Sequence, residues 1–136
     1  MKKEMKEKLL QILNTNPKWP IIIEGVEIAN IPYDVVIPAS IPSRNLGIIP
    51  TEKGLVCPTW VKEITRLSQK QNPIILCIDG LDGILIQDQE KFYGLLKYKA
   101  INGYKFPQKT QIVITATNVA NISEKILGLC FLAKWE

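Results

Sequence analysis

The sequence of 136 residues has no histidine and only three cysteines. Without histidine, Ser-His and Cys-His nucleophile pairs, imidazole acid–base catalysis and imidazole metal ligands are all excluded. Cys57, Cys77 and Cys130 are too scattered for a CxxC zinc site. An odd number of cysteines in apolar contexts is typical of buried free thiols in a reducing cytosol. We therefore expect a cytoplasmic protein that holds no metal.

Long hydrophobic runs are also missing. No segment has the about 18–20 consecutive apolar residues that a membrane-spanning helix needs. Charged residues interrupt the apolar stretch near the N-terminus, and the apolar segment 126–135 contains Gly128 and Lys134. These patterns predict neither a signal peptide nor a membrane helix, so no membrane partner is expected.

The excess of positive charge is small, because 17 Lys and Arg residues against 13 Asp and Glu residues give a formal net charge of +4. This excess permits contact with an acidic partner, but no dense basic block or RNA-binding motif accompanies it. A content of 46% hydrophobic and 22% charged residues indicates a folded globular chain. The length suits a single domain over residues 1–136.

The hydrophobic pattern alternates between the period of a helix and the continuous apolar runs of buried strands. Amphipathic spacing predicts helices at residues 3–14, 58–70, 87–98 and 122–127. Apolar and β-branched runs predict strands at residues 20–25, 34–37, 74–78, 111–117 and 129–133. Frequent prolines and glycines between positions 38 and 58 predict a long loop. This order predicts the α/β class, as a three-layer sandwich around a mostly parallel sheet of about five strands.

Polar residues follow two of the predicted strands. Asp79 and Asp82 come after the apolar run 74–78, and Asn118 follows the strand at 111–117. In an open parallel sheet, ligands lie outside the carboxyl ends of the strands, so Asp79 and Asn118 are expected at the same edge. The alternative is that the two Asp-Gly pairs are turns, since Asp and Gly are frequent turn residues.

Three segments in this order resemble the core of an AAA+ ATPase, in particular its MoxR and dynein-related branch. Residues 74–82 are similar to the Walker B strand, residues 102–110 to the connection that follows, and residues 111–118 to the sensor 1 strand. Residues 39–47 resemble the segment after the second strand more weakly. The resemblance implies a P-loop NTPase-like core, in which Asp79 helps to hold magnesium and Asn118 positions the attacking water.

The segment after the first strand departs from this pattern. A P-loop requires G-x-x-x-x-G-K-[ST], whose amides and lysine hold the phosphates. The chain has Gly25 as the only glycine there, no lysine, and the carboxylates Glu24 and Glu27. A like-charge contact at about 4 Å costs about 4 kcal/mol at an effective dielectric constant of 20. We therefore expect no Mg-ATP cofactor.

Other parts of the ATPase pattern are missing as well. Between Gly25 and Asp34 the chain is too short for the glycine loop plus a crossover helix, so the place of the strand at 34–37 stays open. Gly80 stands where the family has its catalytic Glu, and no arginine follows Asn118. We expect a reduced core without the family's helical lid.

These absences predict a non-catalytic pseudo-ATPase scaffold that contacts another macromolecule, most simply a protein. The long loop is the expected contact surface, with Arg44, Asn45, Lys53 and Trp60 as candidate interaction residues. The alternative for Trp60 is an ordinary core residue. Because nucleotide joins the subunits of ring-forming relatives, its absence favours a monomer or dimer.

Two further hypotheses stay open. One is a reduced magnesium-dependent nucleotidase that uses Asp79 and Asp82 as its metal site, with Asn118 nearby. The other is weak nucleic-acid binding through a lysine-rich face, although such a cluster is often just solvated. The lysines of that face are Lys97, Lys99, Lys105 and Lys109.

Overall fold

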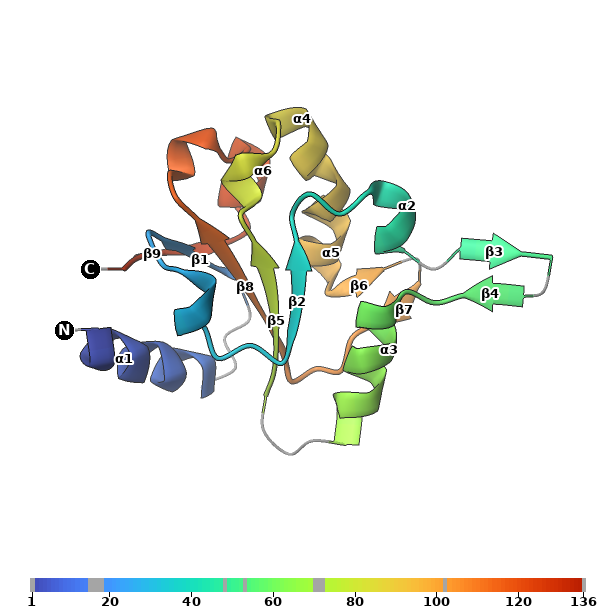
Figure 1. The fold of residues 1–136 in the computed structure, drawn as a ribbon, viewed down its shortest axis with the longest axis horizontal. Helices are drawn as coiled ribbons and strands as arrows, with labels where there is room; N and C mark the ends of the chain where they lie inside the picture. Colours follow the sequence, from blue (N-terminus) through green and yellow to red (C-terminus); the bar gives the residue numbers. More distant parts are fainter. Residues whose placement is uncertain are drawn as a thin grey trace.

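A computed structural model describes residues 2–14, 19–47, 49–52, 54–69, 73–101 and 103–135 (Figure 1). Its centre is a five-stranded sheet with the strand order β2-β5-β8-β1-β9, in which every neighbouring pair is parallel. The strands are β1 (Ile21–Glu24), β2 (Val35–Pro38), β5 (Ile74–Asp79), β8 (Thr110–Ala116) and β9 (Phe131–Lys134). The predicted α/β class and mostly parallel five-stranded sheet are therefore confirmed.

The apolar runs of β5 and β8 place these strands at the centre of the sheet. Residues Ile74 to Ile78 and all of β8 are buried. A strand covered on both faces has no solvent side, which is why its sequence is continuously apolar rather than alternating. The final strand begins two residues later than predicted, at Phe131.

One face of the sheet is covered by α3 (Thr59–Arg66), α5 (Tyr93–Tyr98) and α6 (Glu124–Leu127). Side chains that alternate along the strands, such as Leu76 and Ile78, pack against Ile64 and Leu95 of these helices. Phe92, fully buried, lies in the 3₁₀ turn η4 (Glu90–Phe92) before α5. The predicted helix at 87–98 is instead three consecutive pieces, α4 (Ile86–Gln89), η4 and α5.

The opposite face is covered by α1 (Lys2–Asn14) and by the connection between β1 and β2. Leu9 and Leu13 of α1 pack with Ile31 of that connection and with Cys77 and Val113 of the sheet. Helices thus lie on both faces, in agreement with a three-layer arrangement.

The connection from β1 to β2 contains no crossover helix, as its length predicted. Residues 25–34 hold only the 3₁₀ turn η1 (Ile28–Asn30). This short chain crosses β8 and β5 and delivers β2 to the edge of the sheet, where it pairs with β5. The place of this strand, open from sequence, is therefore an edge position.

The segment from 38 to 58 is not the long loop that its prolines and glycines predicted. It contains the short helix α2 (Ser43–Leu46) and an antiparallel hairpin of β3 (Ile49–Thr51) and β4 (Gly54–Val56), which projects from the body (Figure 1). A second small hairpin, β6 (Ala100–Ile101) with β7 (Tyr104–Lys105), was not predicted. Strands of two or three residues are too short to produce a period-2 signal.

Three further short turns complete the described elements: η2 (Leu67–Gln69), η3 (Leu81–Gly83) and η5 (Val119–Asn121). None of the helices in the described ranges combines the length and the apolar character that crossing a bilayer requires.

Candidate functional site

The carboxyl ends of β1 and β8 form the topological switch point of the sheet. The chain leaves β1 toward β2 at one edge, and it leaves the neighbouring β8 toward β9 at the other edge. Ligands of open α/β sheets bind in the crevice outside the strands at this point. Of the predicted residues, Asp79 is the last residue of β5, Asp82 follows β5 and Asn118 follows β8, so all three lie at this end of the sheet.

Asp82 and Asn118 are brought together. One carboxylate oxygen of Asp82, Oδ2, accepts hydrogen bonds from the backbone N–H of Thr117 (3.0 Å) and of Asn118 (2.8 Å). The side chain of Asn118 in turn accepts the N–H of Ala120 at 3.0 Å and caps η5. Both side chains therefore organise the turn after β8.

Asp79 has a different partner. Its Oδ1 accepts a hydrogen bond of 2.6 Å from the hydroxyl of Thr115, whose oxygen accepts the N–H of Gly80 at 2.9 Å. Gly80 has a φ of +77°, so the left-handed turn that starts here suits glycine. Burial, and then the negative charge of Asp79, raises the pKa of the Cys77 thiol to about 12.

The turn after β1, where a P-loop would lie, is closed by contacts within the chain. Glu24 Oε2 accepts the N–H of Val119 at 2.9 Å, and the Glu24 carbonyl accepts the N–H of Trp135 at 2.8 Å. Gly25, with a φ of +87°, donates its N–H to the Ala116 carbonyl at 2.8 Å. Three successive amides after β8, from Thr117 to Val119, are thus bonded to carboxylates of the protein itself.

Sequence reasoning missed Gln89, a fully buried side chain that joins the loops at this end of the sheet. Its Nε2 donates to the carbonyls of Leu81 (3.2 Å), Ile84 (3.3 Å) and Asn121 (2.8 Å). Its Oε1 accepts the N–H of Ser123 at 2.8 Å. A signal was present, because Gln89 lies three positions before Phe92 and so occupies the apolar side of the predicted helix.

The carboxylates do not assemble into an evident metal site. Within the described ranges, no group of three or more His, Cys, Asp and Glu residues is placed to hold a metal ion. Asp79 and Asp82, the predicted magnesium ligands, are each engaged by protein donors. Asp82 would have to release two backbone amides to give that oxygen to a cation.

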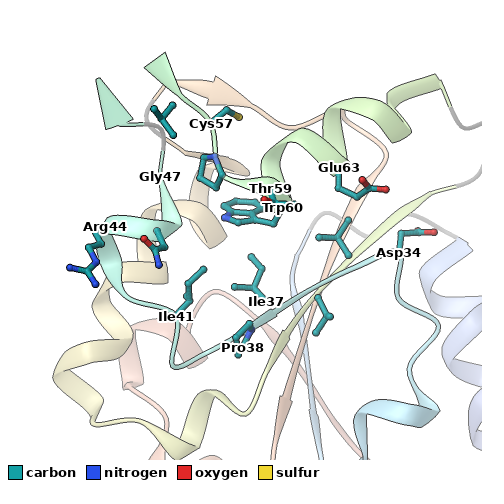
Figure 2. Close-up of a pocket in the computed structure, with 15 residues that line it drawn as sticks. Asp34, Ile37, Pro38, Ile41, Arg44, Gly47, Cys57, Thr59, Trp60 and Glu63 are labelled. Carbon is teal, nitrogen blue, oxygen red and sulfur yellow. The ribbon is translucent and has the colours of Figure 1, made fainter. Parts of the chain in front are cut away.

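A second candidate site lies along the outer edge of β2. A pocket of about 670 Å³, named here the edge pocket, opens between β2, α2, the end of β4 and the start of α3 (Figure 2). Three of the four predicted interaction residues line it: Arg44, Asn45 and Trp60. The fourth, Lys53, lies outside the described residues.

Trp60 forms part of the inner wall of the edge pocket. Its side chain is buried, with 7% of its surface exposed, and it packs edge to face against Phe106 with ring centroids 5.7 Å apart. The indole N–H is buried and has no hydrogen-bond partner among the described residues. Trp60 is thus a core residue, as the alternative interpretation had it, and it also borders a cavity.

Charged side chains lie at opposite ends of the edge pocket (Figure 2). Arg44 is exposed at one end and forms no ion pair with any described residue. Asp34 and Glu63 are at the other end. Asp34 Oδ2 accepts the N–H of Ile75 at 2.8 Å, and Glu63 pairs with Arg66, whose hydrogen bond lowers the pKa of the Glu63 carboxyl.

Three of the four predicted lysines share a groove of about 720 Å³, named here the lysine groove. Lys97, Lys99 and Lys105 line it together with Trp19 and Tyr98, whereas Lys109 is not among its lining residues. Lys97 Nζ lies 5.4 Å from the centre of the Tyr98 ring. Burial lowers the pKa of Lys99.

Comparison of the chain with protein-family models and with curated proteins gave no match.

Proposed function

We propose that the protein is a non-catalytic binding module, built on a reduced core that resembles an AAA+ ATPase and acting by contact with another protein. The observation that carries this proposal is that the backbone amides at the switch point already have hydrogen-bond partners within the protein. The amides of Thr117, Asn118 and Val119, which border the crevice where a ligand would lie, are bonded to Asp82 and Glu24, and the turn after β1 has no glycine loop to replace them. A triphosphate would have to displace two carboxylates from their amides and then lie beside them.

The missing groups argue against phosphoryl transfer on independent grounds. Catalysis of this reaction is almost entirely positioning and charge stabilisation. The turn at Gly25 supplies no lysine, and Gly80 supplies no carboxylate to orient a water. What remains at this end of the sheet is a set of hydrogen bonds that stabilises the fold.

The edge pocket supports contact with a protein. Its apolar walls enclose a space that a side chain of a partner protein can fill, as anchor residues do at protein interfaces. It also lies along an edge strand, where further backbone can pair.

Titration calorimetry with Mg-ATP tests the proposal. We expect no binding heat up to millimolar nucleotide and no hydrolysis. Micromolar binding with turnover, abolished by Asp79→Ala but kept in the control Asp88→Ala, would instead support the magnesium-dependent nucleotidase. Asp88 is an exposed carboxylate on α4, so its loss leaves Asp79 and its partner Thr115 intact.

The lysine groove favours a second candidate, the binding of single-stranded nucleic acid. None of the described residues that line the groove is acidic, and the aromatic side chains of Trp19 and Tyr98 are 46% and 66% exposed. Lysines beside exposed rings are typical of surfaces that bind phosphates and stack bases.

Fluorescence anisotropy with a labelled oligothymidylate tests this candidate. Three phosphate contacts predict a slope of about −2 for log K against log salt concentration. Tyr98→Ala should weaken binding, and the control Tyr33→Ala, at an exposed tyrosine that does not line the groove, should not. Salt-independent binding, or equal loss in both variants, would contradict it.

A further inference from the structure

We propose that the edge pocket binds an extended segment of a partner protein in which an acidic, an apolar and a basic side chain alternate. The segment adds to the open edge of β2 and places its carboxylate against Arg44 and the indole N–H of Trp60. This inference rests on the proposed function as a protein-binding module and specifies its site and the chemistry of its partner.

The outer edge of β2 is available for backbone pairing. Among the described residues, β2 pairs only with β5. The N–H of Ala39 donates to the Asp79 carbonyl of β5, so alternation along the strand turns the N–H and C=O of Val36 outward. Pro38, two residues later, has no N–H, which is the usual position of proline on an edge strand. One residue of β2 can therefore accept and donate a hydrogen bond to an added chain.

The walls beside this edge accept an apolar side chain. Val56, which lines the pocket, is 52% exposed, and Val36, whose side chain lies on the opposite face of β2 from Ile37, is 39% exposed. Ile37 and Trp60 also line the pocket and are buried, and Ile41 is partly buried (Figure 2). An added strand places alternate side chains on one face, so one residue of the segment enters this space while its neighbours point away.

The Trp60 indole N–H and the Arg44 guanidinium are two donors without a partner among the described residues, and the positive charge of Arg44 favours a negatively charged acceptor. The Trp60 indole N–H is buried without a partner, and a buried donor is stabilised when it gains an acceptor. Figure 2 shows the indole nitrogen on the side of the ring toward Arg44. The Arg44 guanidinium has no carboxylate partner among the described residues, and guanidinium groups bind carboxylates through two parallel hydrogen bonds.

The carboxylates at the opposite end of the pocket favour a peptide with charges of both signs over a simple anion. Asp34 and Glu63 lie there, so a polyphosphate that filled the pocket would meet two carboxylates. An extended segment instead matches both ends when an acidic residue, an apolar residue and a basic residue alternate. Such side chains, four positions apart at the extremes, span about 13 Å.

The experiment follows the indole resonances of ¹⁵N-labelled full-length protein during titration with the peptide acetyl-Glu-Thr-Val-Thr-Lys-amide. The reversed sequence, acetyl-Lys-Thr-Val-Thr-Glu-amide, is titrated separately because either strand direction is compatible with the edge. Trp60→Phe identifies the Trp60 resonance among the three tryptophans. We expect one peptide to shift this resonance and the amide of Val36, and we expect the matching Gln peptide to shift neither.

Arg44→Gln should weaken the binding about 10- to 100-fold, the range expected for loss of a charge-assisted hydrogen bond. The control Lys134→Gln removes an exposed cation on β9, at the opposite edge of the sheet, and should leave binding unchanged. An unmoved Trp60 resonance with both peptides at millimolar concentration overturns the proposal. An equal shift of the Trp60 resonance with acetate or inorganic phosphate alone also overturns it, because it indicates a small-anion site. A shift of this resonance with protein concentration overturns it as well, because it indicates that a second copy of the chain occupies the pocket.

The two proposals fail in different ways. Peptide binding at β2 together with Mg-ATP turnover would remove the non-catalytic function but keep the edge pocket as a peptide site. If neither peptide binding nor Mg-ATP turnover is observed, the non-catalytic proposal stands, and the proposed peptide partner is rejected.

Discussion

Asp82 accepts the backbone N–H of Asn118 in a hydrogen bond of 2.8 Å. The two residues follow different strands and were predicted as parts of a magnesium site and a water-positioning site. In the folded protein they stabilise one turn at the end of β8. Because of this hydrogen bond, the Asn118 amide and the Asp82 carboxylate oxygen that accepts it are already engaged within the protein.

Asp82→Ala should lower the free energy of unfolding by about 1–3 kcal/mol, because two backbone amides lose a charged acceptor. Urea denaturation measures the change. The control Asp88→Ala removes an exposed carboxylate on α4 and should stay within about 0.5 kcal/mol of the parent. Equal stability of the two variants would mean that the Asp82 hydrogen bonds contribute nothing measurable.

Gln89→Leu should destabilise the protein by about 2–4 kcal/mol, because three carbonyls and the Ser123 amide lose a buried partner. Gln87→Leu, on the exposed side of the same helix, is the matched control. Denaturation gives the free energies, and hydrogen exchange should show faster exchange of the Ser123 amide. Unchanged protection of that amide would contradict the prediction.

Gly25→Ala should cost about 1–2 kcal/mol, because a φ of +87° is unfavourable for a residue with a Cβ. The added Cβ would lie 3.5 Å from the Trp135 carbonyl, so backbone strain rather than a clash dominates. Gly83→Ala is the control, since its φ is ordinary and nothing lies near its Cβ position. Equal thermal stability of both variants would argue against this turn geometry.

Thiol labelling at pH 8 should modify Cys57 before the other two cysteines. Cys57, which lines the edge pocket, and Cys130 are both partly exposed, and Cys77 is buried. Desolvation raises the pKa of the Cys77 and Cys130 thiols to about 12, so both stay protonated at pH 8. Mass spectrometry after brief exposure to iodoacetamide should find a single adduct, on Cys57. A peptide bound in the pocket should slow this reaction, and faster labelling of Cys77 would contradict its burial.

Alkaline pH should weaken the fold partly through Cys77. Its pKa rises from 9.0 when unfolded to about 12 when folded, because burial disfavours the thiolate. Between these values the unfolded chain binds fewer protons than the native one, so the free energy of unfolding falls as the pH rises. Denaturation midpoints from pH 8 to 11 should decline more steeply for the parent than for Cys77→Ala. If the midpoints of the parent and of Cys77→Ala declined equally, the loss of stability would come from groups other than Cys77.

Much of the fold could be predicted because it depends on local apolar patterns. The continuous run from Ile74 to Ile78 predicted a strand buried on both faces, and the short chain after Gly25 predicted a crossover without a helix. The hairpin of β3 and β4 could not be predicted, since its three-residue strands are defined by their pairing and not by periodicity.

The sequence by itself determined which segments are apolar, where the phosphate loop and its lysine are missing, and which polar residues follow the strands. These properties depend on residue type and spacing along a few turns of chain. The tertiary structure decided that Asp82 and Glu24 bind the amides after β8, that Gln89 joins two loops, and that Trp60 borders a pocket beside β2. Those contacts join residues from different strands, and the strand order that brings them together follows from packing of the whole sheet.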